Sequence, residues 1–155
     1  MQPIEWSSEL EIGIDVIDGQ HRRIVDYINE LQRVTDEEND PVTRRVINDL
    51  IDYTYSHFAF EEALMEEADY DSLPIHRKTH EAFCSRIEDF KRRSEAGEAV
   101  AQPLGDLLRT WLLRHIMSDD ESYAELVKEK MPRIRRQDKG SWLDQSLRRF
   151  FGPSD

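Results

Sequence analysis

Two short stretches, each carrying two metal-ligating side chains four residues apart, constrain this chain more than any other feature. HFAFE at residues 57–61 pairs a histidine with a glutamate, and HRKTH at residues 76–80 pairs two histidines. Residues i and i+4 of an α-helix lie on the same face, one turn apart. Since imidazole and carboxylate groups bind transition metals, each stretch predicts a helix that presents two ligands to one site.

The hydrophobic periodicity predicts four long helices joined by short loops. We expect Asp18 to cap the first helix, Ser72 to cap the third, and the fourth to end before Pro132, which cannot continue a helix. The expected ranges are residues 19–34, 41–67, 73–94 and 104–130. These lengths and loops are typical of an all-α, up-down-up-down four-helix bundle.

The two ends of the chain read differently from the bundle. Residues 1–17 alternate apolar and acidic side chains around Gly13, and we expect an extended arm that packs on the body. Residues 132–140 read as a basic linker and residues 141–151 as a short amphipathic helix. We therefore place a domain boundary between residues 131 and 132.

Composition excludes several classes of function. The net charge is −12, and the acidic excess lies in the first 127 residues, which argues against binding nucleic acid. No apolar run reaches the length of a transmembrane segment. The single cysteine, Cys84, cannot form an internal disulfide and fits a reducing compartment. With no secretory leader, we expect a cytoplasmic protein.

The histidines all fall on the faces that should point inward. They are His21, His57, His76, His80 and His115. Each buried ring nitrogen left without a partner would cost about 1–3 kcal/mol. Glu61 and an aspartate after His115, either Asp119 or Asp120, would be buried charges, which are tolerable only when paired or bound to metal. A shared metal site explains all of these positions together.

The number and type of donors indicate two ions of iron. Five imidazoles and two bridging carboxylates exceed what one ion accepts, and with one bridging oxygen they leave one position open on two six-coordinate ions. No thiolate accompanies them, which excludes a cysteine-type zinc site, and a nitrogen-rich set with bridging carboxylates suits iron. The chain lacks the Glu-x-x-His motif of ferritin-like oxidases. A histidine-rich site fits reversible O2 binding better than substrate oxidation.

At these positions the chain resembles the bacterial hemerythrins, over residues 5 to about 125. The residues that carry the resemblance are Trp6, Gly13-Ile14, Ile17-Asp18-x-Gln20-His21, His57-Phe58-x-x-Glu61-Glu62-x-x-Met65, His76-x-x-x-His80, Trp111-Leu112 and His115-Ile116-x-x-x-Asp120-x-x-Tyr123. The resemblance implies that residues 1–131 are a hemerythrin-like di-iron domain.

The resemblance also implies a ligand set around two non-haem irons joined by an oxo or hydroxo group. One iron would be held by His76, His80 and His115, the other by His21 and His57, with Glu61 and Asp120 bridging both. Helical spacing from His115 alone favours Asp119. We choose Asp120 because a bridging carboxylate must reach between the ions, and a local distortion of the helix would help it do so.

The function implied is reversible binding of O2, for storage, delivery or buffering, without catalytic turnover. The alternatives are a sensor that signals the oxidation state of the irons, and a di-iron protein that handles nitric oxide or peroxide. We expect a monomer. Residues 132–155 either fold back on the bundle, which we favour, or contact a protein partner or an anionic membrane surface.

Overall fold

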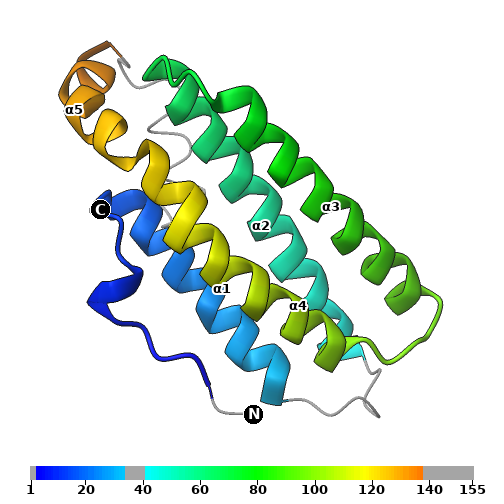
Figure 1. Cartoon of the computed structure of the whole chain (residues 1–155). Helices are drawn as coiled ribbons and strands as arrows, with labels where there is room; N and C mark the ends of the chain where they lie inside the picture. Colours follow the sequence, from blue (N-terminus) through cyan, green and yellow to red (C-terminus); the bar gives the residue numbers. More distant parts are fainter. Residues whose placement is uncertain (1–2, 34–40, 138–155) are drawn as a thin grey trace.

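Four long rods make up the fold, and the last of them is built from three helical segments. The computed structural model describes residues 3–33 and 41–137, apart from the side chains of residues 42, 118–121 and 134–137. The segments are α1 (Asp15–Arg33), α2 (Pro41–Glu67), α3 (Leu73–Glu95), α4 (Ala101–Arg114), the π-helix η2 (His115–Asp120) and α5 (Glu121–Gln137). Figure 1 shows the rods side by side with alternating direction, which confirms the expected bundle.

Helix α2 is the central rod, packing against both α1 and α3, while α1 also packs on α4. It begins at Pro41, where the missing N–H of proline has no intrahelical partner to lose. Its buried side chains recur every three or four residues and include Ile47, Leu50, Thr54, His57, Glu61 and Leu64. The expected bounds of this helix are confirmed at both ends.

Helix α1 begins at Asp15, so the prediction that Asp18 caps a helix starting at Gly19 is wrong. Asp18 lies in the first turn, and its carboxylate reaches back to accept hydrogen bonds from the backbone N–H groups of Ile12 (2.8 Å) and Gly13 (3.1 Å). The carbonyl of Ile14 accepts the first backbone bond of the helix, from the N–H of Asp18. An acid inside the first turn thus joins the arm to the helix instead of marking its start.

The arm packs along the bundle as expected, with its apolar side chains Ile4, Leu10, Ile12 and Ile14 buried. It contains one short 3-10 turn, η1 (Ser8–Leu10). Paired hydrogen bonds between the backbone of Ile4 and the side-chain amide of Asn29 fix its outer end to α1. At its inner end Gly13 adopts φ +89°, and the side chain of Lys128 approaches to 2.6 Å from where a Cβ at this position would be. The arm therefore contacts the first and the last rod.

The fourth rod departs from expectation at both ends. It starts at Ala101 instead of Leu104, and α5 continues through Pro132 to Gln137, so the predicted stop before Pro132 is wrong. A proline inside a helix removes one backbone bond and bends the helix, without always ending it. Figure 1 shows the end of α5 (orange) turning away from the line of α4. Residues 132–137 are thus helical, whereas the short helix expected at 141–151 and the boundary after residue 131 stay predictions, the former outside the described residues.

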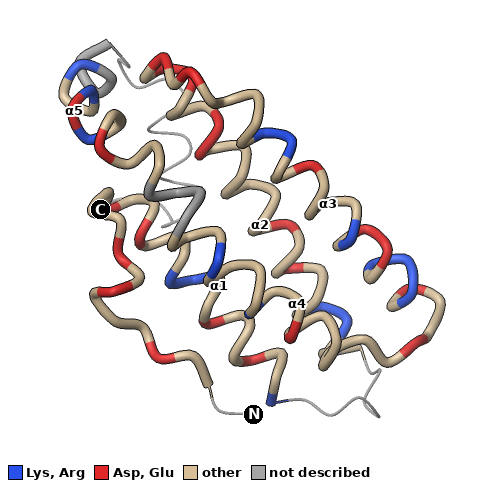
Figure 2. Tube along the Cα trace, in the orientation of Figure 1, with Lys and Arg blue, Asp and Glu red and all other residues tan. Residues whose placement is uncertain are grey.

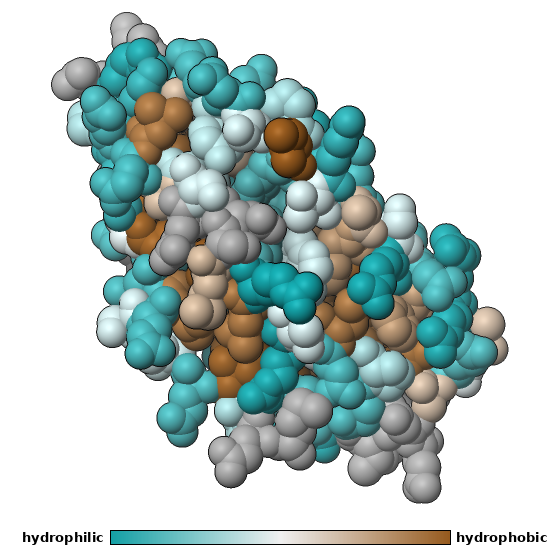
Figure 3. All heavy atoms as spheres, viewed as in Figure 1, coloured by the Kyte–Doolittle hydropathy of each residue, from teal (hydrophilic) through white to brown (hydrophobic). Residues whose placement is uncertain are grey.

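The surface is strongly charged, as the composition requires. Figure 2 shows only acidic charges along the arm, and charges of both signs along α3 and α5. Figure 3 shows polar side chains over much of the same face, with apolar atoms visible between the helices. Among the helices that the structure describes, none combines the length and apolar character needed to cross a membrane.

Candidate metal centre

The sequence-predicted histidines converge in the middle of the bundle. His21 comes from α1, His57 from α2, His76 and His80 from α3, and His115 from the first residue of η2. All of them are buried, and the most exposed, His76, has only 5% of its surface accessible. The i,i+4 spacing places two ligating groups on each of α2 and α3, as predicted, and helices α1 and η2 complete the group from the other side.

Glu61 lies fully buried at the centre of these imidazoles. Its two carboxylate oxygens face two different sets of Nε2 atoms. Oε1 lies 2.7 Å from His76, 3.1 Å from His80 and 3.5 Å from His115. Oε2 lies 3.1 Å from His57 and 3.9 Å from His21. One carboxylate thus divides its oxygens between a three-histidine group and a two-histidine group.

Each of these groups has the composition and spacing of a metal site. Within the three-histidine group, and separately within the two-histidine group, one ligand atom of each residue lies within 4.8 Å of the others, with Glu61 common to both. Imidazole nitrogen with carboxylate oxygen is a donor set for first-row transition metals. The residues present therefore fit two neighbouring ions that share Glu61.

Electrostatics favour an ionised carboxylate at this position. Burial by itself raises the pKa of Glu61, but the nearby charge of His57 and hydrogen bonds from His115, His57 and His76 outweigh it, and the pKa lies well below its usual value. Glu61 therefore keeps the negative charge that a bridging ligand needs.

The outward-facing Nδ1 atoms of two imidazoles hydrogen-bond to polar side chains on neighbouring helices. His57 Nδ1 donates to Gln20 Oε1 over 2.6 Å, and His80 Nδ1 donates to Glu62 Oε2 over 2.9 Å. With Nδ1 donating outward, Nε2 of each ring faces the centre and can bind a metal ion in exchange for its own proton, as metal-ligating histidines require. Sequence reasoning missed both partners, because it treats Glu62 as a solvated acid, whereas Glu62 is only partly exposed and bonds His80. The signal available was the position of each beside a ligand, Gln20 before His21 and Glu62 after Glu61.

These hydrogen bonds also shift two pKa values. Burial lowers the pKa of His80, but hydrogen bonds to Glu61 and Glu62 outweigh it and raise the pKa. Burial raises the pKa of Glu62, but its hydrogen bonds to His80 and Arg77 outweigh that effect and lower the pKa. In the His80–Glu62 pair, the imidazole therefore keeps its proton and donates a hydrogen bond to an ionised carboxylate.

Aromatic rings enclose the three-histidine group. Phe58 stacks on His80 with 4.0 Å between ring centroids, and Trp111 stacks on His115 at 4.3 Å. Tyr123, fully buried, lies edge-on to His76 at 5.5 Å. These rings fix the imidazole orientations by packing, and Trp111 contributes to this packing through its stack on His115.

The π-helix changes the relation between His115 and the aspartates that follow it. Backbone bonds in a π-helix join residues five apart, so His115 and Asp120, its first and last residues, are one turn from each other. On an α-helix Asp120 would be displaced about 100° beyond Asp119. The distortion removes the geometric objection to Asp120, whose side chain lies outside the described part of the chain.

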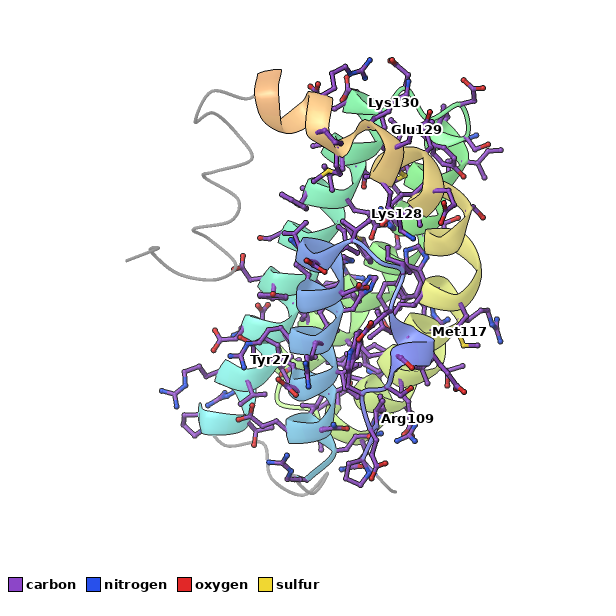
Figure 4. All side chains as sticks on the ribbon, turned by 90° about the vertical axis from the view of Figure 1, so that its left-hand side faces the viewer. Tyr27, Arg109, Met117, Lys128, Glu129 and Lys130 are labelled. Atoms are coloured by element: carbon purple, nitrogen blue, oxygen red, sulfur yellow. The ribbon has the colours of Figure 1, made fainter. Side chains whose placement is uncertain are left out.

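Met117 points away from the centre. Its place in the family resemblance implies an apolar residue of the O2 pocket, and an ordinary core methionine is the alternative, but Met117 is 57% exposed. Figure 4 shows it on the outer side of the rod. The wide turn of η2 displaces the residues within it, which periodicity does not anticipate.

Comparison with known proteins matches this geometry to a family. The sequence matches the family model of the hemerythrin HHE cation binding domain over residues 12–127. The chain belongs to the hemerythrin family. It is 42% identical over 153 residues to bacteriohemerythrins of Stenotrophomonas maltophilia (strain R551-3) and Pseudomonas aeruginosa (strain LESB58), covering 98% of this chain and 100% of each relative. A crystal structure of wild-type hemerythrin aligns with TM-score 0.77 at 27% identity, covering 81% of this chain and 98% of that one.

Membership in the hemerythrin family confirms the expected class. Hemerythrins bind O2 at non-haem iron and are not enzymes. The two bacteriohemerythrins match 98% of this chain, so the match extends past residue 131. The aligned hemerythrin structure covers 81% of this chain. The individual ligand assignments, the monomeric state and the cytoplasmic location stay predictions.

Proposed function

We propose that this chain binds O2 reversibly at a pair of iron ions joined by Glu61 and Asp120. The observation that carries the proposal is the division of the Glu61 oxygens between two groups of imidazole nitrogens. A buried carboxylate with imidazoles on both sides is poorly explained by a single ion, which would use one side only.

The two groups differ in the number of ligands that they offer. His76, His80 and His115 would hold one iron, and His21 and His57 the other. With both carboxylates and an oxo or hydroxo bridge in place, the iron bound by His21 and His57 would have one ligand fewer. The ions would supply an open position for O2 and the two electrons that bind it reversibly.

The protein would contribute a closed and largely apolar environment. The ligating side chains are buried, and Phe58 and Trp111 cover the three-histidine group with stacked rings. Exclusion of water suits storage, delivery or buffering of O2, because it opposes side reactions that would keep the bound molecule from leaving as O2. We propose this role for the monomeric protein in the cytoplasm.

The test combines metal analysis with reversible oxygenation. Purified protein should carry two irons per chain, gain a visible absorption band when the reduced form meets air, and lose it under vacuum over repeated cycles. His57→Ala should lower the iron content and abolish the band, whereas Met117→Ala, at an exposed position near His115, should retain both. Protein without iron, or irreversible oxidation on first exposure, would contradict the proposal.

A further inference from the structure

One imidazole of each set, His80 and His57, bonds an outer partner, and these two partners differ in charge. On the three-histidine side, His80 Nδ1 donates to the carboxylate of Glu62 over 2.9 Å, while its Nε2 lies 3.1 Å from Glu61. On the two-histidine side, His57 Nδ1 donates to the amide oxygen of Gln20 over 2.6 Å. Both bonds fix the orientation of an imidazole, but only Glu62 can add negative charge to one.

Glu62 is held in place by a second contact from α3. Arg77 Nε donates to Oε1 of Glu62 over 2.9 Å, so each oxygen of this carboxylate has its own donor, Arg77 or His80. The Arg77 side chain is 44% exposed, and water therefore screens its charge. Arg77 aims the carboxylate at His80 without cancelling its effect on the ring.

Glu62 also borders solvent, which allows it to remain ionised. Its side chain is 20% exposed and lines an open groove of about 680 Å³ between α2 and α3. The same groove is lined by His80, Cys84 and Glu81. Gln20, in contrast, is fully buried, where a carboxylate would be costly. The charged partner therefore occupies the position where a charge is tolerated.

We propose that Glu62 is a positioning residue that makes His80 a stronger electron donor than His57, whose partner is neutral. A carboxylate that accepts the outer N–H of a ligating imidazole fixes its tautomer and raises its basicity. Hydrogen bonds to charged acceptors are roughly twice as strong as neutral ones. Glu62 thus strengthens metal binding by the three-histidine group and stabilises the more oxidised state of an ion bound there. This inference rests on the proposed di-iron function for its redox part only.

Three substitutions separate the charge of Glu62 from its position. Glu62→Gln keeps an oxygen that can accept from Nδ1 but removes the charge, and Glu62→Ala removes both. Glu81→Gln is the matched control, because it removes one negative charge from the same groove at an exposed position next to His80. A general effect of surface charge would be similar in Glu62→Gln and Glu81→Gln.

The first measurement is the affinity of metal-free protein for Co²⁺, followed by absorption of the bound ion. We expect Glu62→Ala to weaken binding on the order of 10-fold to 100-fold, Glu62→Gln by less, and Glu81→Gln by under about threefold. The second is the midpoint potential of the iron-loaded protein, which Glu62→Gln should raise by about 59 mV or more, a tenfold change for one electron. Thermal melting checks that each variant folds.

A role for Glu62 as a simple clamp between α2 and α3 predicts a different result. Glu62→Gln and Glu62→Ala would then lower the melting temperature while Co²⁺ affinity and potential stayed equal to those of Glu81→Gln, and this outcome would overturn the inference. If the wild-type protein fails to bind O2 reversibly but the Co²⁺ affinities follow the expected order, the proposed function fails and the role of Glu62 in metal binding stands.

Discussion

Helix α2 and the fourth rod each bring a histidine to the metal centre, but their helical geometry differs. α2 is one uninterrupted helix in which His57 and Glu61 lie one turn apart, as i and i+4. The fourth rod reaches the centre through a π-helix, in which His115 and Asp120 are separated by five positions. In a regular α-helix, the sequence spacing of two ligands predicts whether they share a face. A π-helix changes the spacing at which two ligands do so. The comparison predicts which carboxylate matters on each rod.

Removal of the carboxylate on α2 should have the largest effect, because Glu61 faces both groups of imidazoles. We expect Glu61→Ala to reduce iron from two ions per chain to fewer than one and to abolish the oxygenated band. Iron analysis and absorption spectra of the purified variant provide the measurement. A variant with both irons would show that α2 does not supply the bridge.

We expect the two aspartates of the fourth rod, Asp119 and Asp120, to differ in their effect on iron binding. If the π-helix brings Asp120 toward the centre, Asp120→Ala should weaken iron binding on the order of 100-fold, while Asp119→Ala should stay close to wild type. Competition with a chelator measures both variants under the same conditions. The reverse order would mean that the fourth rod follows ordinary helical spacing and that our choice of Asp120 is wrong.

The metal-free protein should be most stable at mildly acidic pH. The lowered pKa of Glu61 stabilises the fold above its unfolded value of about 4.3, and this contribution is lost as pH falls through the lower folded value. The raised pKa of His80 stabilises the fold below its unfolded value of about 6.5, and this contribution is lost as pH rises through the higher folded value. Denaturant midpoints should therefore peak between about pH 4.3 and 6.5.

Bound metal and a variant test that pH profile. Loading with iron should remove the decline on the alkaline side, since the metal replaces the proton on His80. In metal-free His80→Gln the alkaline decline should shrink as well. An unchanged decline in that variant would assign it to other groups.

The smallest effects concern the starts of the helices. Asp18→Ala removes the acceptor for two backbone N–H groups and should cost about 1–2 kcal/mol of unfolding free energy. Ser72 occupies the N-cap position of α3 without a side-chain capping bond. Ser72→Ala should therefore cost only about a few tenths of a kcal/mol of unfolding free energy. Urea denaturation measures both, and equal losses would contradict the difference in hydrogen bonding between Asp18 and Ser72.

The parts of the fold that sequence could predict are those governed by local chemistry. Pro41 marks the start of α2, and the i,i+4 pairs place the ligands of α2 and α3 on one face each. The five histidines could be grouped before the structure because every one of them fell on an apolar stripe. Their common burial followed from the physical need to satisfy imidazole nitrogens.

The parts that sequence could not predict depend on how the rods meet. Nothing in the residues of η2 distinguishes a π-helix from an α-helix, and Pro132 is compatible with either an end or a bend. Glu62 follows Glu61 by about 100° around α2, so whether it meets water or His80 depends on where α3 lies. Asp18 was misassigned for the same reason, because its partners belong to the arm.

The contact between Gly13 and Lys128 has a consequence for the order in which the chain assembles. The ribosome makes Lys128 more than a hundred residues after Gly13, at about 5–20 residues per second. Ile4 can meet Asn29 and Gly13 can meet Asp18 within the first rod, but the contact between Gly13 and Lys128 has to wait until the last rod emerges. The arm is made before all four rods but is therefore among the last segments to complete its contacts.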